Sequence, residues 1–195
     1  LLARAYAGPG DEIMFTEHGF LMYPIVTKGV GATPVAVPEN NLYADVDVLL
    51  ERAGPKTKIL YLANPNNPTG TLIDGNQLRD FCTSLPEDTI TLIDEAYIEY
   101  SDDFNYASMV DLVRAGENVV VTRTFSKIHG LAGLRVGYAI APPEIAKRIA
   151  TFKVCRFQGP MGVVAANVSL NDTEWQDFCR IKNKEGREDV YKLCE

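Results

Sequence analysis

A lysine, two hydroxyl groups and an arginine lie close together in the stretch TFSKIHGLAGLR, residues 124–135. Ser126 and Lys127 follow a run of β-branched residues, and Arg135 comes eight residues later in a glycine-rich turn. A lysine amine at the end of a buried strand can form a Schiff base with an aldehyde, and hydroxyl and guanidinium groups bind phosphate. The stretch therefore predicts a site for a phosphorylated aldehyde, with Thr124 among the phosphate ligands.

An acid and a phenol end another apolar run, in the segment LIDEAYIEY at residues 92–100. Asp94 directly follows Leu92 and Ile93, where an unpaired carboxylate would be costly to bury. A protonated ring nitrogen would supply the missing positive charge, and Tyr97 could then hydrogen-bond a phenolic oxygen on the same ring. Asp94 could equally cap the next helix, so both interpretations stay open.

A third strand is expected to end in the turn ANPNNPTG, residues 63–70. Its prolines, asparagines and glycine cannot continue a helix or a sheet, and such a segment can be nothing more than a turn. Alternatively, Asn67 directs its side-chain amide at a ring oxygen. An amine, an acid, a phenol, an amide and a phosphate clamp at successive strand ends together match pyridoxal 5′-phosphate.

Short segments rich in β-branched or aromatic residues alternate along the chain with segments of helical periodicity. The predicted strands are 12–18, 33–38, 58–65, 89–96, 118–125 and 135–142. Helices are predicted at 74–85, with Asp74 as N-cap, and at 144–154. This alternation predicts an α/β fold, a three-layer α/β/α sandwich with a mostly parallel sheet, which binds ligands at the carboxyl ends of its strands.

Both ends of the sequence suggest a piece of a longer chain. Residues 1–7 have the pattern of a helix end that is stopped by a Gly-Pro-Gly turn, and residues 172–195 form a long helical pattern that runs to the last residue. A change in sequence character near residues 150–172, where one helical pattern passes through Gly159 and Pro160 into another, suggests the exit toward a second domain. We expect residues 1–155 to form most of a cofactor-binding large domain. Residues 156–195 are expected to be connecting helices that lead toward a small domain.

Composition argues against several other classes of protein. The net charge is −7 with no basic stripe, which disfavours nucleic acid and anionic membranes as partners. The four cysteines are scattered without a C-x-x-C pair, which fits the reducing cytoplasm better than a disulfide framework. Neither of the two histidines lies at ligand spacing from a cysteine, so no metal site is expected.

The motifs NPNNPTG, DEAY and SKIHGLAGLRVGY resemble those of the fold type I aminotransferases, the aspartate aminotransferase superfamily. Within it, the sequence is most similar to the histidinol-phosphate aminotransferases, over essentially its whole length. The resemblance implies that Lys127 holds pyridoxal phosphate as a Schiff base and later moves the proton, while Asp94 pairs with the ring nitrogen. The other implied contacts are Asn67 and Tyr97 to the ring 3-oxygen, and Thr124, Ser126 and Arg135 to the phosphate.

The resemblance also implies an aromatic side chain over the face of the cofactor ring. Phe20 is our candidate, although it could be an ordinary core residue, and His18 is the alternative.

The implied function is an aminotransferase of histidine biosynthesis, which moves an amino group from histidinol phosphate to 2-oxoglutarate. Its partners would be a small-molecule amino donor, a 2-oxo acid and a second copy of the chain in a homodimer.

A threonine-phosphate decarboxylase-like enzyme and an aromatic aminotransferase are the alternatives that keep the cofactor. A catalytically incomplete fragment is a further one, because a phosphate-binding loop upstream and a small domain downstream lie outside this sequence. A nucleotide-binding domain is disfavoured, because neither G-x-x-x-x-G-K-[ST] nor G-x-G-x-x-G occurs at the expected place.

Overall fold

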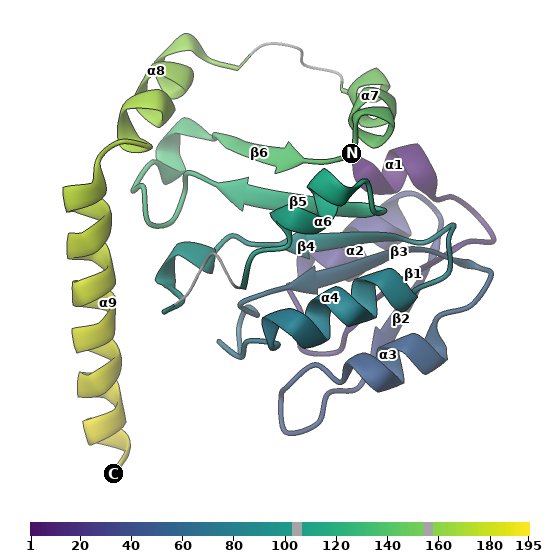
Figure 1. The fold of residues 1–195 in the computed structure, drawn as a ribbon, viewed down its shortest axis with the longest axis horizontal. Coiled ribbons are helices and arrows are strands. Elements are labelled where there is room, and N and C mark those ends of the chain that lie inside the picture. Colours follow the sequence, from purple (N-terminus) through teal and green to yellow (C-terminus); the bar gives the residue numbers. More distant parts are fainter. Residues whose placement is uncertain (103–106, 154–157) are drawn as a thin grey trace.

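A twisted sheet of six strands forms the centre of the computed structural model, which describes residues 1–102, 107–153 and 158–195 (Figure 1). The strand order is β2-β1-β3-β4-β5-β6, and all neighbours are parallel except β5 and β6, which are antiparallel. The strands are β1 (Glu12–Thr16), β2 (Thr33–Val37), β3 (Thr57–Ala63), β4 (Ile90–Asp94), β5 (Val119–Thr124) and β6 (Gly137–Ile140).

Helices connect the parallel strands, as a parallel sheet requires. They are α1 (Leu2–Tyr6), α2 (Met22–Gly29), α3 (Val46–Arg52), α4 (Gly75–Ser84), α6 (Val110–Ala115), α7 (Pro143–Thr151), α8 (Pro160–Ser169) and α9 (Thr173–Cys194). Asp45 and Asp74 cap α3 and α4 by accepting hydrogen bonds from backbone N–H groups of the first turn. Two short 3₁₀ helices, η1 (Ile98–Tyr100) and η2 (Ala132–Leu134), follow β4 and β5.

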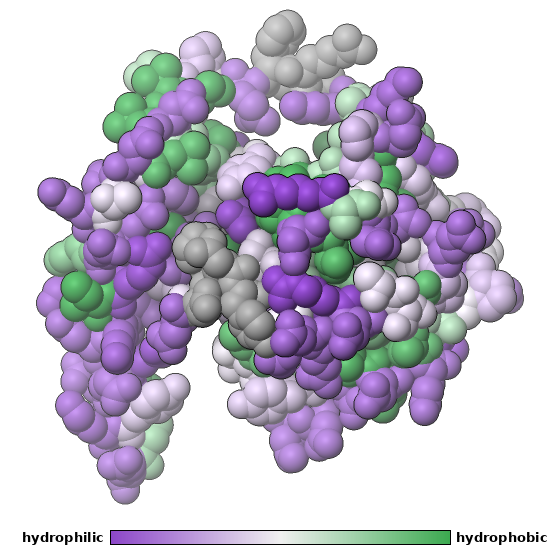
Figure 2. Space-filling view, in the orientation of Figure 1, coloured by the Kyte–Doolittle hydropathy of each residue, from purple (hydrophilic) through white to green (hydrophobic). Residues whose placement is uncertain are grey.

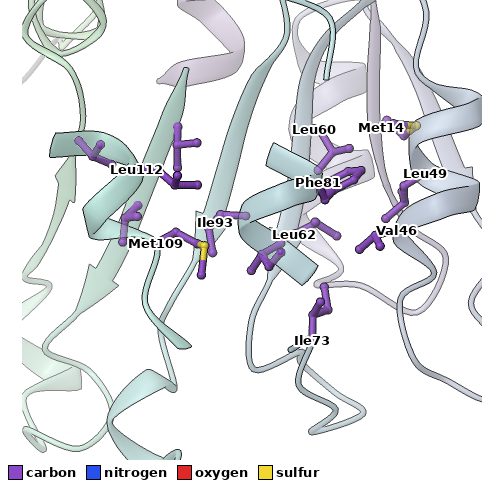
Figure 3. Packing of buried hydrophobic residues seen from close by; sticks show 14 of the residues in the cluster. Met14, Val46, Leu49, Leu60, Leu62, Ile73, Phe81, Ile93, Met109 and Leu112 are labelled. Atoms are coloured by element: carbon purple, nitrogen blue, oxygen red, sulfur yellow. The ribbon is translucent and has the colours of Figure 1, made fainter. Parts of the chain in front are cut away.

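The core has two halves, because alternate residues of each strand point to opposite faces of the sheet. In β3, Leu60 and Leu62 pack beneath α3, α4 and α6, in the cluster of Figure 3, while Ile59 and Tyr61 pack with residues of α1, α2 and α7. Ile59 and Leu60 are fully buried. Helices therefore cover both faces of the sheet, and the predicted three-layer sandwich is confirmed.

The predicted elements are present, with ends that differ by a few residues. The strand predicted at 12–18 ends at Thr16, and the strand predicted at 58–65 ends at Ala63. The helix predicted at 74–85 is α4, and its cap is Asp74 as expected. The helix predicted at 144–154 is α7, which ends at Thr151, and the end of that predicted range lies outside the described residues.

The C-terminal part of the chain lies beside the sheet rather than over it (Figure 1). None of the 22 residues of α9 is buried, and Figure 2 shows hydrophobic side chains gathered over α8 and the start of α9. Met161 and Val168 of α8, for example, are 77% and 66% exposed. Among the described residues, no helix is both long and apolar enough to cross a membrane.

Candidate functional site

Five of the predicted site residues meet at one edge of the sheet. Because β1, β3, β4 and β5 run parallel, their carboxyl ends lie side by side there. The segments that follow these strands enclose a small cavity of about 80 Å³. Its lining contains an aromatic ring, an amide, a carboxylate, a phenol and an amine, from Phe20, Asn67, Asp94, Tyr97 and Lys127.

Lys127 extends from the turn after β5, three residues beyond the end of the strand. The turn is closed by the Gly130 N–H, which donates to the Lys127 carbonyl at 2.9 Å. Gly130 has φ +68°, a conformation that favours glycine. The Lys127 Nζ lies 4.9 Å from the centre of the Tyr97 ring, so the amine and the phenol belong to one cluster.

Asp94, the last residue of β4, is a carboxylate held in a poorly solvated place. Thr122 Oγ1 and the Ala96 N–H each donate to its Oδ1 at 3.2 Å. Burial raises the pKa of Asp94, and these two hydrogen bonds and the charge of Lys127 oppose that rise only in part. The Asp94 site would therefore be stabilised by a further positive charge. The Ala96 contact is a local turn interaction, and the next helix, η1, has Tyr97 at its N-cap without a side-chain hydrogen bond. The alternative that Asp94 caps this helix is therefore wrong.

Asn67 belongs to a turn that is braced by its own side chains. Asn64 is fully buried, and its Oδ1 accepts a hydrogen bond from the Ile73 N–H at 2.8 Å. Asn66 Nδ2 donates to Thr69 Oγ1 at 2.8 Å, and the Gly70 N–H donates to the Asn66 carbonyl at 2.9 Å. This bracing fixes the backbone that presents the Asn67 amide to the cavity.

The three predicted phosphate ligands flank Lys127 in the chain. Thr124 Oγ1 accepts a hydrogen bond from the Ser126 N–H at 3.1 Å, which places these two residues in one tight turn. Arg135 adopts a left-handed conformation, and its guanidinium donates to the Ala132 carbonyl at 2.8 Å. In the described part of the chain, none of the three lines the small cavity.

Phe20 and His18 occupy different places. Phe20 lines the small cavity and meets Tyr23 edge to face, with ring centres 5.8 Å apart. His18 instead turns outward, and its Nδ1 lies 2.6 Å from Glu39 Oε2. Of the two aromatic candidates, only Phe20 borders the cavity, so Phe20 remains our prediction for the ring face.

A larger cavity of about 930 Å³ adjoins the first one. It shares Asn67, Tyr97 and Lys127 with the small cavity, and α9 adds Asn183 and Arg187 to its lining. The Lys127 amine therefore belongs to the lining of both cavities.

A buried ion pair behind the site was missed by the sequence analysis. Glu95 is fully buried and accepts hydrogen bonds from Arg123 Nε and Nη2 at 2.9 and 2.8 Å. Its carboxylate also accepts from the Met109 N–H at 2.7 Å and from Ser108 Oγ. Glu95 directly follows Asp94 and Arg123 directly precedes Thr124, so this pair ties the ends of β4 and β5 together. The sequence feature that could have indicated this ion pair is the position of Glu95 in the DEAY segment and of Arg123 in the TRTFSK segment.

Comparison with known proteins identifies a family that this chain matches. The family model for aminotransferase class I and II matches residues 1–179. A histidinol-phosphate aminotransferase of Rhodospirillum centenum is 46% identical over 188 residues, which cover 96% of this chain and 52% of that protein.

Two solved structures have the same fold. A putative histidinol-phosphate aminotransferase from Erwinia carotovora atroseptica superposes with a TM-score of 0.92 at 30% identity, covering 98% of this chain and 56% of that chain. The histidinol-phosphate aminotransferase of Sinorhizobium meliloti, solved in complex with pyridoxal 5′-phosphate, superposes with a TM-score of 0.91 at 28% identity, over 97% and 52% of the two chains. The chain spans about half the length of these relatives. By its sequence and its fold, it belongs to the class I and II aminotransferase family.

Proposed function

We propose that this chain is the cofactor-binding part of a pyridoxal-phosphate-dependent aminotransferase that acts on histidinol phosphate and 2-oxoglutarate. The observation that carries the proposal is the small cavity, where Lys127, Asp94, Tyr97 and Asn67 meet. The name histidinol-phosphate aminotransferase, which the relatives above share, supports this reaction over decarboxylation or an aromatic substrate.

The donor set of the cavity fits the functional groups of pyridoxal phosphate. Asp94 is a partly buried carboxylate that a protonated ring nitrogen would neutralise. Asn67 and Tyr97 carry donors for the ring 3-oxygen, and the Lys127 amine is the nucleophile for the aldehyde. Thr124, Ser126 and Arg135, next to the lysine in the chain, are proposed to hold the phosphate.

When bound, the cofactor supplies an electron sink for the negative charge that develops on the substrate carbon. Asp94 would keep the ring nitrogen protonated, because an opposite charge stabilises the charged form. Lys127 would accept and return the substrate proton, and it would have to be neutral at that moment. Phe20, which lines the small cavity, would cover one face of the ring and exclude water from it.

The amino donor and the 2-oxo acid are proposed to reach Lys127 through the larger cavity. The lining contains Asp74 and Asp102 as well as Arg187, so we propose Arg187 as the contact for one anionic group of the substrate. We further propose a cytoplasmic homodimer, in which residues 1–155 form most of the large domain and residues 156–195 connect to a small domain.

Covalent trapping of the cofactor on Lys127 tests the proposal. The chain is incubated with pyridoxal phosphate, reduced with borohydride and mapped by peptide mass spectrometry. We expect the label on Lys127, and its complete loss in Lys127→Ala, because no other amine lines the small cavity in the described chain.

Lys147→Ala, which removes an exposed amine on α7, is the matched control and should label as the wild type does. A folded wild-type chain without label on Lys127 would contradict the cofactor site. Assays of the full-length protein with histidinol phosphate, O-phosphothreonine and aromatic amino acids then separate the three candidate reactions.

A further inference from the structure

His18 connects three neighbouring strand ends at the edge of the sheet that carries the site. It follows β1, its side chain contacts Glu39 after β2, and its backbone carbonyl accepts a hydrogen bond from Asn66 Nδ2 after β3. These strands are adjacent, in the order β2-β1-β3. One residue therefore joins three segments, two of which carry predicted cofactor contacts.

The contact between His18 and Glu39 has three parts. The His18 N–H donates to Glu39 Oε1 at 2.9 Å and to Oε2 at 3.2 Å, and His18 Nδ1 lies 2.6 Å from Oε2. The Glu39 side chain is only 1% exposed, whereas that of His18 is 54% exposed. A buried carboxylate gains most from such contacts, because it has few water molecules as alternative partners.

Two short segments of the chain connect the His18–Glu39 contact to the small cavity. Phe20 is two residues beyond His18, and Gly19 between them is packed so closely that an added Cβ would lie 2.9 Å from the Thr16 carbonyl oxygen. On the other path, Asn66, which donates to His18, directly precedes Asn67. Both Phe20 and Asn67 line the small cavity, so the two segments that His18 joins each contribute a residue to its lining.

We propose that His18 and Glu39 form a latch that positions Phe20 and Asn67 for the cofactor ring, and that the latch is tighter when His18 is protonated. The positioning role follows from the contacts of the protein alone. Only its effect on the cofactor depends on the function proposed above.

Protonation of His18 is favoured by two acidic neighbours. Its pKa is raised above the ordinary value, mainly by the hydrogen bond and the charge of Glu39, with a smaller contribution from Glu17. Since the pKa is raised in the folded state, the stabilising contribution of the ion pair is fully present below a pH of about 6.5 and is lost as the pH rises through the raised pKa. The backbone hydrogen bonds to Glu39 persist throughout, so the latch weakens at high pH and does not open.

A titration followed by nuclear magnetic resonance tests the positioning role without any cofactor. The chain has only two histidines, so the imidazole signals of His18 and His129 are readily assigned. We expect the side-chain amide signals of Asn66 and Asn67 to shift with the same midpoint as His18. In Glu39→Gln that midpoint should fall toward about 6.5, and the asparagine shifts should follow it. If the Asn66 and Asn67 signals do not shift as His18 titrates, the proposed latch is wrong.

Cofactor affinity gives the second measurement, as the ratio between wild type and His18→Gln at each pH. Near pH 5.5 the wild type should bind pyridoxal phosphate about two- to fivefold more tightly, the range of a partly exposed ion pair, and near pH 8.5 the ratio should approach one. Glu17→Gln is the matched control and should stay close to the wild type at both values.

The two proposals fail in different ways. If the wild type does not label on Lys127, the cofactor proposal fails, and the magnetic resonance titration still decides the latch. If the wild type labels but the affinity ratio is the same at both pH values, the latch is wrong and the cofactor site stands.

Discussion

At the scale of single residues, the site is a place where function and stability conflict. Asp94 is a carboxylate whose pKa is raised by burial, and Thr122 and Ala96 provide only two hydrogen bonds of 3.2 Å to it. A structure optimised for stability alone would place a neutral group there. The free-energy cost of burying the Asp94 charge would be offset by a cationic ring nitrogen bound in the site.

Asp94→Asn should therefore stabilise the cofactor-free chain at pH 7 by on the order of 1 kcal/mol while weakening pyridoxal phosphate binding. Because folding raises the Asp94 pKa, the cost of its charge is present at neutral pH and disappears as the pH falls below the ordinary value of 3.8, where the carboxyl is protonated in both states. Urea unfolding at both pH values measures this difference. Asp88→Asn, at a side chain that is 88% exposed, should change little.

At the scale of elements, α9 holds two of the segments that carry site residues. Trp175 Nε1 donates to the Ile128 carbonyl at 2.8 Å, next to Lys127. Arg180 Nε donates to the Glu99 carbonyl at 2.8 Å, in the 3₁₀ helix that follows Tyr97. No residue of α9 is buried, so these side-chain hydrogen bonds are a large part of what fixes the helix to the sheet.

Trp175→Phe should lower the free energy of unfolding by about 1 kcal/mol, because it keeps an aromatic ring near Gly130 and removes one hydrogen bond. Trp175 is the only tryptophan, so unfolding of the variant is best followed by circular dichroism. Val190→Ala, at an exposed position on the same helix, is the control and should change stability by less than about 0.5 kcal/mol. Equal stabilities of wild type and Trp175→Phe would mean that α9 is held by other contacts.

At the scale of the whole molecule, the first helix, α1, contacts α7, which lies far away in the sequence. Arg148 of α7 donates from Nε to the Ala5 carbonyl of α1 at 2.8 Å, and its guanidinium lies 4.4 Å from the centre of the Tyr6 ring. The two helices lie on the same face of the sheet. This contact joins residues 143 positions apart in the chain.

Arg148→Met should reduce the free energy of unfolding by roughly 1–2 kcal/mol, the sum of one hydrogen bond and one cation–π contact. The methionine keeps an apolar stem, so the change isolates the guanidinium. Lys147→Met, at the neighbouring exposed position, is the control and should have little effect. A loss as small as that of the control would show that α1 is held by its apolar residues alone.

Local sequence patterns predicted most of the secondary structure and the fold class of this protein. The alternation of strand and helix patterns predicted the α/β sandwich, because each short pattern needs a sheet or a helix to bury its apolar side. Asp74 predicted the start of α4, since capping involves only neighbouring residues. Strand ends were less accurate, as for 12–18 against Glu12–Thr16, because the sheet and not the segment decides where pairing stops.

The sequence also indicated which residues lie at the strand ends. Because the carboxyl ends of parallel strands share one edge of a sheet, it predicted that these residues converge. The tertiary structure decided which of them share a cavity. It placed Phe20 and Lys127 in the lining of one cavity. It also turned His18 outward to Glu39, whose buried carboxylate follows a different strand, β2. It also paired Glu95 with Arg123 and fixed α9 at Ile128. Such contacts join residues distant in the chain, and their free energy depends on burial that only the assembled sheet creates.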